Sequence, residues 1–277
     1  MSADLVFNSP ERVAALTKHN PFDRLPDGRP RVPDDLLQRL RSVTNDEAWG
    51  VLERHHEYHY QFEGNWLNLH PDQVLVGRAM TAMFMPKRPD LDEVINEAGA
   101  ERGFPAGKQN TWVIDSTVEG DVLVVDLFGK VRDGTMIGDN LGTALGARTR
   151  GGGLVVDGGI RDVLRLRQLD NLAVFARGMD PSAIYDVTLV SVNAPIRIGS
   201  AVVMPGDAVL GTSVGVTFIP PHLVEEVVTH SEDVRQRDVF GKQMLAEGRY
   251  TSGQIDVGVW AEQIEAHYHA WLTEQNP

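Results

Sequence analysis

Two short motifs in this 277-residue sequence combine residue types that bind anions and cations. The first is GDNLG at residues 138–142, which opens a stretch with helical character. Free backbone N–H groups at a helix N-terminus, helped by the helix dipole, bind carboxylate or phosphate groups. Asp139 is also a residue type common at helix starts, so it is either a helix cap or a member of a binding site.

The second motif is the adjacent pair Arg161-Asp162, which follows the apolar run 154–156 and a glycine-rich turn. Arginine can hold a carboxylate in a bidentate fork, and one aspartate can be the protein ligand of a magnesium ion that keeps its waters. The alternative is an ordinary Asp helix cap beside a solvated Arg. Because both motifs come just after predicted buried strands, where α/β sheets bind ligands, together they predict a site for a small anionic substrate chelated to a divalent metal.

Other chemistry is weakly supported. His55 and His59 are four residues apart and would share one face of a helix, but Glu57 does not fit the H-E-x-x-H metal pattern. A surface stripe or a subunit contact is the favoured interpretation. The absence of cysteine excludes disulfides, thiolate nucleophiles and cysteine-bound zinc. No phosphate-binding loop or nucleophile elbow is found, and the lack of a core lysine disfavours Schiff-base chemistry.

The hydrophobic pattern predicts strands that alternate with helices early and cluster later, which is typical of an α/β fold with a mixed sheet. Ser9 and Pro10 suit the start of a first helix, and Thr44 with Glu47 forms a capping-box pattern. Strands are expected at 73–85, 120–129, 153–156 and 172–180 and as several short strands within 187–220; helices are expected at 8–19, 34–60, 89–101 and 138–152 and beyond 221.

Composition narrows the class of protein. Hydrophobic residues make up 42% of the chain and charged residues 23%, as in soluble globular proteins. A net charge of −13 with no basic run argues against a nucleic-acid partner. The first residues lack signal-peptide features, and no apolar stretch approaches the ~18 residues of a membrane span. We expect a cytoplasmic protein with no membrane partner.

The stretch 138–162 resembles the signature of the RraA-like family, in which a Gly-Asp or Gly-Glu pair is followed about twenty residues later by Arg-Asp. Supporting similarity lies at residues 43–52, 174–178 and 192–211, and the resemblance covers roughly residues 36–250. The family includes divalent-metal-dependent 4-hydroxy-4-methyl-2-oxoglutarate aldolases, oxaloacetate decarboxylases and regulators of ribonuclease activity.

The resemblance implies an α/β fold with a mixed-sheet, swivelling β/β/α-type core, here with added helical segments at both termini. It implies trimers or hexamers with active sites between subunits. On this basis residues 1–33 are an N-terminal extension and linker, 34–250 the family domain, 87–119 an insertion within it, and 251–277 a C-terminal helical tail.

The same resemblance implies roles for the two motifs. Asp162 would bind Mg²⁺ or Mn²⁺ directly, and Asp139 would bind it through water. Arg161 would hold the substrate, whose carboxylate would lie on the helix start at Gly138, Asn140 and Leu141. Arg161, Asp162 and Asp139 are thus the predicted catalytic residues.

Family aldolases also use an acidic residue from the C-terminal helix of a neighbouring subunit, for which Asp238 is the first candidate and Glu232 the second. Two departures affect the expected substrate. The spacer between Asp139 and Arg161 has 21 residues, one more than is usual, and residues 210–220 lack the acidic residues that often precede the last strand.

The predicted function is a class II type lyase that cleaves a 4-hydroxy-2-oxo acid to pyruvate and also decarboxylates oxaloacetate. Both reactions break a C–C bond next to a 2-oxo acid and benefit from a metal that stabilises the developing negative charge. Two alternatives remain open: another metal-dependent enolate-forming lyase or hydratase acting on a sugar-derived acid, and a non-catalytic binding protein like the ribonuclease regulators.

Overall fold

The computed structural model describes residues 5–275, which fall into two compact units, residues 5–227 and 228–275. The division lies within helix α8 (Val224–Ala246), earlier than the expected start of a tail at residue 251. The physical reason is that the later part of α8 packs in an aromatic core of the second unit. The two units are described separately below.

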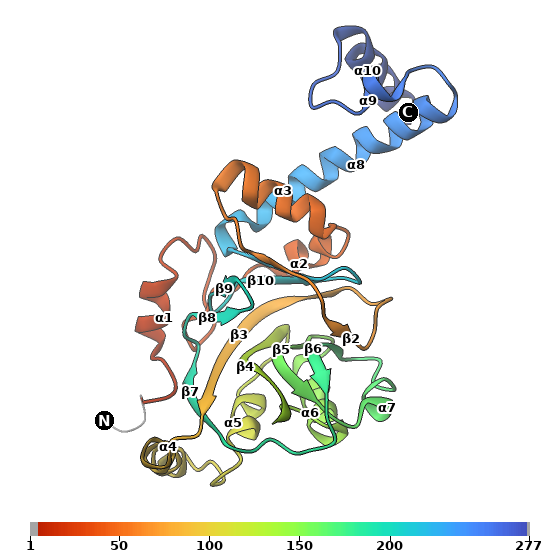
Figure 1. The fold of residues 1–277 in the computed structure, drawn as a ribbon. Helices are drawn as coiled ribbons and strands as arrows, with labels where there is room; N and C mark the ends of the chain where they lie inside the picture. Colours follow the sequence, from red (N-terminus) through yellow and green to blue (C-terminus); the bar gives the residue numbers. More distant parts are fainter. Residues whose placement is uncertain (1–4, 276–277) are drawn as a thin grey trace. The chain divides into compact units, whose positions relative to one another are not determined.

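A mixed sheet forms the centre of the first unit (Figure 1). Strands β3, β4, β5 and β6 are parallel neighbours, whereas β1, β2, β7, β10 and β11 pair antiparallel with their partners. The mixed sheet predicted from the sequence is confirmed. Its strands are β1 (Phe62–Glu63), β2 (Leu67–Asn68), β3 (Leu75–Pro86), β4 (Asp121–Thr135), β5 (Gly153–Ile160), β6 (Ala173–Met179), β7 (Val187–Val192), β10 (Ala208–Gly211) and β11 (Val216–Ile219); β8 (Ile196–Ile198) and β9 (Ala201–Val203) form a separate pair.

The helices of the first unit begin where the predicted caps stand. Ser9 accepts the N–H of Arg12, and the Thr44–Glu47 capping box is present in both directions. The helices are α1 (Pro10–Leu16), α2 (Asp34–Leu40), α3 (Asn45–His56), α4 (Pro89–Glu101), α5 (Gln109–Asp115), α6 (Asp139–Thr149), α7 (Val163–Leu166) and the 3₁₀ turn η1 (Pro221–Leu223).

Helix α3 ends earlier than the sequence suggested. Glu57 adopts a left-handed conformation with φ of 60°, so the helix stops at His56. The expectation that His55 and His59 share a helix face is therefore wrong. His59 instead binds Glu53 at 2.8 Å, and His56 binds Glu226 at 2.9 Å.

Both faces of the parallel strands are buried, which explains their nearly continuous apolar sequences. On one face, Leu123 and Val156 pack in a core with residues of α5 and α6, including Trp112 and Leu145. On the other face, the alternate residues of the same strands form a second core with β8–β11; its members include Val122, Val124, Val155, Phe175, Ile198, Val203 and Phe218. Residues 87–119, the predicted insertion, contribute α4 and α5 to the first core.

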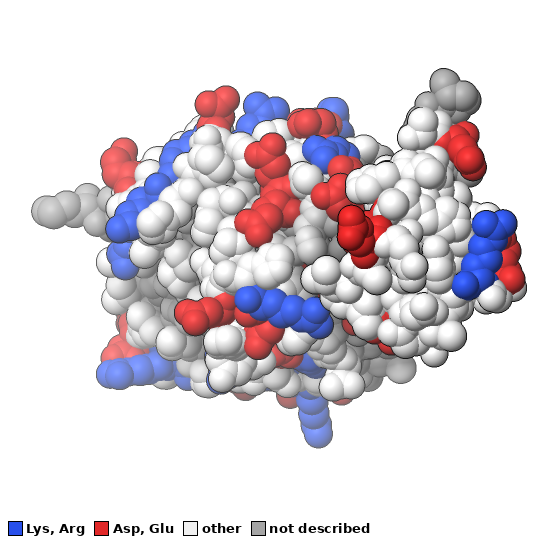
Figure 2. Space-filling view, turned by 90° about the horizontal axis from the view of Figure 1, so that it is seen from above, with Lys and Arg blue, Asp and Glu red and all other residues white. Residues whose placement is uncertain are grey.

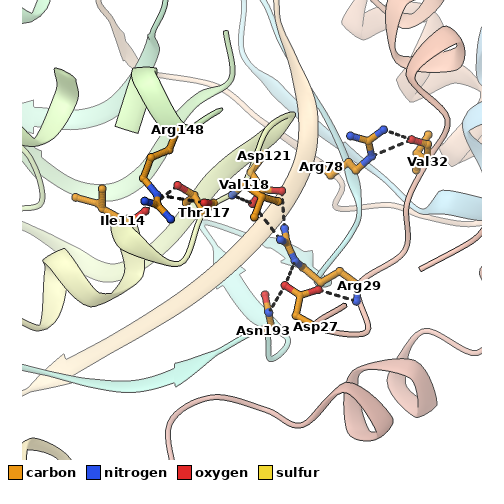
Figure 3. A network of polar contacts seen from close by, with 10 residues as sticks. All are labelled: Asp27, Arg29, Val32, Arg78, Ile114, Thr117, Val118, Asp121, Arg148 and Asn193. Carbon is orange, nitrogen blue, oxygen red and sulfur yellow. Dashed lines mark hydrogen bonds and ion pairs between the residues drawn. The ribbon is translucent and has the colours of Figure 1, made fainter. Parts of the chain in front are cut away.

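The N-terminal segment is fastened to the sheet by buried charge (Figure 3). The Arg29 guanidinium is 1% exposed and donates to both carboxylate oxygens of Asp121, at 2.7 and 3.0 Å. It also pairs with Asp27, whose carboxylate accepts from Asn193 at 3.1 Å. Residues 20–33 lack regular helix or strand, and they pack as part of the first unit.

Residues 61–66 pack against the ends of β5 and β6. The Arg177 guanidinium donates to Asp157 at 2.6 Å and to Glu63 at 3.3 Å, and it lies 3.8 Å from the ring centroid of Trp66. Glu63 in turn accepts the backbone and hydroxyl donors of Ser200, both at 2.5 Å. This network ties the loop before β3 to the strands that carry the Arg-Asp motif.

The second unit contains the rest of α8, α9 (Ser252–Ile255) and α10 (Glu262–Gln275). Phe240, Met244, Trp260 and Tyr268 form its small core, and Arg237 lies over the Trp260 ring at 3.9 Å. Across residues 5–275, none of the helices combines the length and apolar character needed to cross a bilayer. On the face in Figure 2, basic side chains are interspersed with acidic ones, a distribution that offers nucleic acid no extended basic surface there.

Candidate functional site

The two sequence motifs meet at the carboxyl ends of neighbouring parallel strands. GDNLG follows β4, Arg161-Asp162 follows β5, and β4 and β5 pair in parallel. Backbone bonds continue the pairing beyond the strands, from Met136 N–H to Gly159 at 2.9 Å and from Arg161 N–H to Ile137 at 3.0 Å. These bonds hold both motifs side by side at the carboxyl ends of the strands.

The Asp162 carboxylate is not used as a helix cap. Asp162 occupies the N-cap position of α7, but its side chain makes no capping hydrogen bond. Its backbone has φ of 53°, a left-handed conformation that costs energy for any residue other than glycine. The carboxylate is instead 37% exposed, with its Oδ2 atom 3.7 Å from Nε of Arg161. The structure therefore disfavours the alternative in which Asp162 is an ordinary cap.

Gly138 provides the space in which this carboxylate lies. A Cβ atom added to Gly138 would stand 2.3 Å from Oδ2 of Asp162 and 3.0 Å from Nε of Arg161. Gly138 has φ of −118°, so the constraint is close approach and not backbone conformation. A glycine at the N-cap of α6 thus brings the helix start into contact with both members of the Arg-Asp pair.

Asp139 has two partners at the start of α6. Its Oδ1 accepts the N–H of Asn140 at 3.0 Å, and its Oδ2 accepts from Arg165 at 3.0 Å. The hydrogen bond from Arg165 is the main cause that lowers the pKa of Asp139 below its usual value. The Asn140 amide, predicted to receive the substrate carboxylate, donates here to Asp139. Leu141 is half-buried in the first turn of α6.

An open pocket of about 640 Å³ lies directly beside Arg161 and Asp162. Its remaining lining comes from α7 and from the residues at the end of β6, namely Val163, Leu164, Arg165, Met179, Asp180 and Pro181. The pocket therefore offers two guanidinium groups to an anion and carboxylates to a cation. Arg165 was not singled out from the sequence; its spacing of three residues from Asp162, on a short helix, is the signal that could have identified it.

The acidic candidates on the C-terminal helix lie in the second unit. Asp238 and Glu232 are both in α8, and the Asp238 carboxylate pairs with Lys242 of the next turn at 3.0 Å. Asp238 is therefore exposed and ion-paired within its own helix. A contribution from it to a neighbouring subunit's site stays a prediction.

The donor set limits which metal would fit. Within residues 5–275 no cluster of three or more His, Cys, Asp or Glu side chains is placed to hold a metal ion. Asp162 and Asp139 are the two carboxylates that follow β4 and β5, and Asp180 follows β6; a set with so few carboxylates suits a hard cation that keeps several waters. The set does not suit a closed four-ligand zinc site.

Comparison with known proteins agrees with the fold. Residues 47–218 match the family model described as RraA-like, Aldolase/RraA. The crystal structure of Streptomyces coelicolor RraAS2, described as an unusual member of the RNase ES inhibitor RraA protein family, superposes with a TM-score of 0.65 at 24% identity, covering 80% of this chain and 99% of that one. An uncharacterized protein from Pseudomonas syringae gives the same TM-score at 21% identity and covers 85% of this chain and 97% of its own.

Two curated relatives match parts of the chain. A Halalkalibacterium halodurans protein named "Putative 4-hydroxy-4-methyl-2-oxoglutarate aldolase" is 34% identical over 130 residues, which are 46% of this chain and 60% of that protein. Protein DlpA of Legionella pneumophila is 28% identical over 218 residues, or 77% of this chain and 32% of DlpA. The matched region is thus less than two thirds of either relative. Because the family model spans more than half of the sequence, the chain belongs to the RraA-like family.

Proposed function

We propose that this protein is a divalent-metal-dependent lyase that cleaves a 4-hydroxy-2-oxo acid to release pyruvate. The observation that carries the proposal is the uncapped Asp162 carboxylate beside Gly138 and Arg161, at the carboxyl ends of β4 and β5. A residue with a strained backbone conformation whose carboxylate does not cap its own helix is expected where function requires it. The match to a relative named as an aldolase supports the same class of reaction.

The residues present fit Mg²⁺ or Mn²⁺, with Asp162 as direct ligand and Asp139 as a ligand through water. Such an ion would polarise the 2-oxo group and stabilise negative charge that develops as the C–C bond breaks. The fit rests on two carboxylates at one sheet edge, because an ion that retains most of its waters needs few protein ligands. Asp238 of a neighbouring subunit would complete the acidic set in a homotrimer or homohexamer.

Arg161 and Arg165 would bind and orient the substrate carboxylates. Arginine pairs bidentately with carboxylates, and both guanidinium groups line the pocket. Asp139 has its pKa lowered by Arg165 and is therefore ionised at neutral pH. In this proposal Asp139 would accept, through an intervening water, the proton of the 4-hydroxyl group and would return a proton to the pyruvate product.

The test is pyruvate release from a panel of 4-hydroxy-2-oxo acids and oxaloacetate, first with EDTA and then with added Mg²⁺ or Mn²⁺. We expect release that EDTA abolishes and metal restores. Turnover of oxaloacetate in the same assay would support the predicted decarboxylase activity. Silence across the panel at high enzyme concentration with metal present would contradict the lyase and favour a binding protein that has kept the fold.

A further inference from the structure

A second pocket of the first unit lies away from the strand-end site and takes no part in the chemistry proposed above. It has a volume of about 460 Å³ and is formed by the end of α1, the segment 57–61, the β8–β9 hairpin and the turn at 220–222. Its lining is mainly apolar and aromatic, with Leu16, Tyr58, Val202, Met204 and Pro221 among its members. Pockets of this size and character are typical of small-molecule sites.

Asp207 supplies a buried carboxyl group to this pocket. The residue is 2% exposed, and its Oδ2 atom accepts the N–H of Met204 at 2.8 Å. Among the described residues, Oδ1 of Asp207 has no hydrogen-bond partner. Burial raises the pKa of Asp207 to about 8, because nothing in the pocket compensates the ionised form beyond that single N–H. Because Asp207 lines the pocket, its ionised form would gain from a positive charge placed next to it.

The remaining charge of the pocket also favours a cation. Among the described residues that line it, none is Lys or Arg, while Glu57 adds a second carboxylate. Arg24, which contacts the lining residue Thr17, donates to the hydroxyl and carbonyl oxygens of Thr17 and to the carbonyl of Gly28. An anionic 2-oxo acid would therefore find no counter-charge here, in contrast to the pocket beside Arg161.

The aromatic groups of the pocket suit the body of such a ligand. Tyr58 and Tyr60 present rings whose faces attract cations. His19 and His222 lie with their ring centroids 5.9 Å apart, and burial lowers the pKa of His222, so that ring is neutral at neutral pH and does not compete with a bound cation. His59, the remaining titratable group in the lining, is paired with Glu53.

The other polar side chains in the lining already have partners. The Gln61 amide donates to the carbonyls of Val202 and Phe218, at 3.1 and 3.0 Å. Asn20 donates to Phe22, and the Ser200 hydroxyl donates to Glu63. Polar recognition therefore falls mainly to Asp207, which fits a ligand with one charged group on an otherwise apolar body.

We propose that this pocket binds a small organic cation, a single protonated nitrogen on a compact aromatic or apolar body, with the nitrogen at Asp207 and the body among Tyr58, Tyr60 and Val202. The site is separate from the strand-end pocket and does not depend on the lyase assignment. A bound amine would form a charge-assisted hydrogen bond to the free Oδ1 atom.

Three probes of nearly equal shape test the charge requirement by isothermal titration at about pH 9, above the pKa of Asp207 and below that of an alkyl ammonium group: 2-phenylethylamine, 2-phenylethanol and phenylacetate. We expect the amine to bind at least about tenfold more tightly than the alcohol, since a buried carboxylate gains from a cationic partner, and phenylacetate not to bind. Equal affinities for amine and alcohol, or no binding of the amine, would overturn the proposal.

Two variants locate the site. Asp207→Asn keeps an acceptor for the Met204 N–H and should remove the preference for the amine, leaving the weak binding of the alcohol. Val202→Trp places a ring into the pocket from a side chain that is 52% exposed and should abolish binding of both. Val214→Trp, at a 62% exposed valine outside the lining, is the matched control and should bind as the unmodified protein does. If Asp207→Asn does not fold, the comparison of Val202→Trp with Val214→Trp tests whether the amine binds in this pocket. Unchanged amine binding in Val202→Trp would show that it binds elsewhere.

Discussion

Two aspartates of the first unit lie in opposite environments. Asp139, at the start of α6, has a side chain that is 26% exposed, and a hydrogen bond from Arg165 lowers its pKa. Asp207 is buried with one backbone donor, and desolvation raises its pKa to about 8. The same residue type thus has a lowered pKa at one position and a raised pKa at the other, because a cationic partner lowers the pKa of a carboxyl group and burial raises it.

The largest effect should come from removing the strand-end carboxylate. Asp162→Ala removes the proposed metal ligand, and we expect kcat to fall at least about a thousand-fold, comparable with loss of a central charge-stabilising group. Because the Asp162 side chain caps no helix, the fold should remain. Steady-state pyruvate release measures the effect, and circular dichroism and light scattering check fold and assembly.

Asp170→Ala is the matched control, an exposed aspartate eight positions further along the chain, and it should keep full activity. Undiminished turnover in Asp162→Ala, or loss of its assembly, would show that this carboxylate has a structural role instead.

The second-largest effect should come from disturbing the close packing between Gly138 and Asp162. Gly138→Ala inserts a Cβ 2.3 Å from Oδ2 of Asp162, so the carboxylate or the helix start must move. A displacement of about 1 Å at a reacting centre costs on the order of a hundredfold in rate, so we expect a loss of that size in kcat/KM. Stability should change by only about 1 kcal/mol, the usual difference between Gly and Ala at an N-cap.

Gly50→Ala in α3 is the control for glycine replacement, because a Cβ there meets nothing within 4 Å. It should leave activity unchanged and stabilise the helix by about 0.5–1 kcal/mol. Activity in Gly138→Ala that matches the control would mean that the contact between Gly138 and Asp162 is not needed for turnover.

The third prediction tests the buried carboxyl through the pH dependence of stability. Below pH about 4, Asp207 is protonated in both the folded and the unfolded chain. Between about pH 4 and 8 the unfolded chain ionises this group while the folded protein keeps its proton, so the free energy of unfolding falls as pH rises, by up to about 1.4 kcal/mol per pH unit. Above pH 8 both states are ionised and the penalty is constant.

In Asp207→Asn the side chain cannot ionise, so this contribution to the pH dependence of the free energy of unfolding should be absent. Urea unfolding of both proteins at pH 5, 6, 7 and 8 should therefore give a stability difference that grows in favour of the asparagine variant as pH rises. A difference independent of pH would falsify the raised pKa and remove one support for the cation pocket.

Sequence patterns predicted much of the fold because local signals were strong. Pro89 and the helical period after it predicted α4 with its observed bounds, and the Thr44–Glu47 pair predicted the start of α3. The end of α3 was missed because no glycine or proline marks it. Glu57 takes a left-handed conformation, which is uncommon for glutamate and could not be predicted from its residue type. The two-residue strands β1 and β2 are too short to show a period of their own.

The candidate site was partly predictable for the same reason. GDNLG and Arg161-Asp162 follow adjacent strands, so parallel pairing alone brings them together. The role of Arg29 was not predictable, because its partner Asp121 is 92 residues away and the segment around it reads as an exposed linker. The role of Asp207 was not predictable either, because its place in a pocket depends on α1 and residues 57–61, which only the folded chain brings beside it.

The smallest effect should come from replacing Arg165, whose hydrogen bond gives Asp139 a lowered pKa in contrast to the raised pKa of Asp207. Arg165→Gln removes the hydrogen bond that mainly lowers the pKa of Asp139, so that pKa should rise. If the ionised form of Asp139 acts as base, the acidic limb of the kcat/KM profile should move to higher pH. At the optimum kcat/KM should fall by about tenfold, because Arg165 is also a proposed contact of the substrate carboxylate, but exposed ion pairs are weak and Arg161 remains. Arg150→Gln, which breaks the exposed pair with Glu119, controls for loss of a surface charge and should leave the profile in place. An acidic limb that does not move in Arg165→Gln would mean that Asp139 is not the group whose ionisation limits turnover, and would assign the proton transfer to another acid in the assembly.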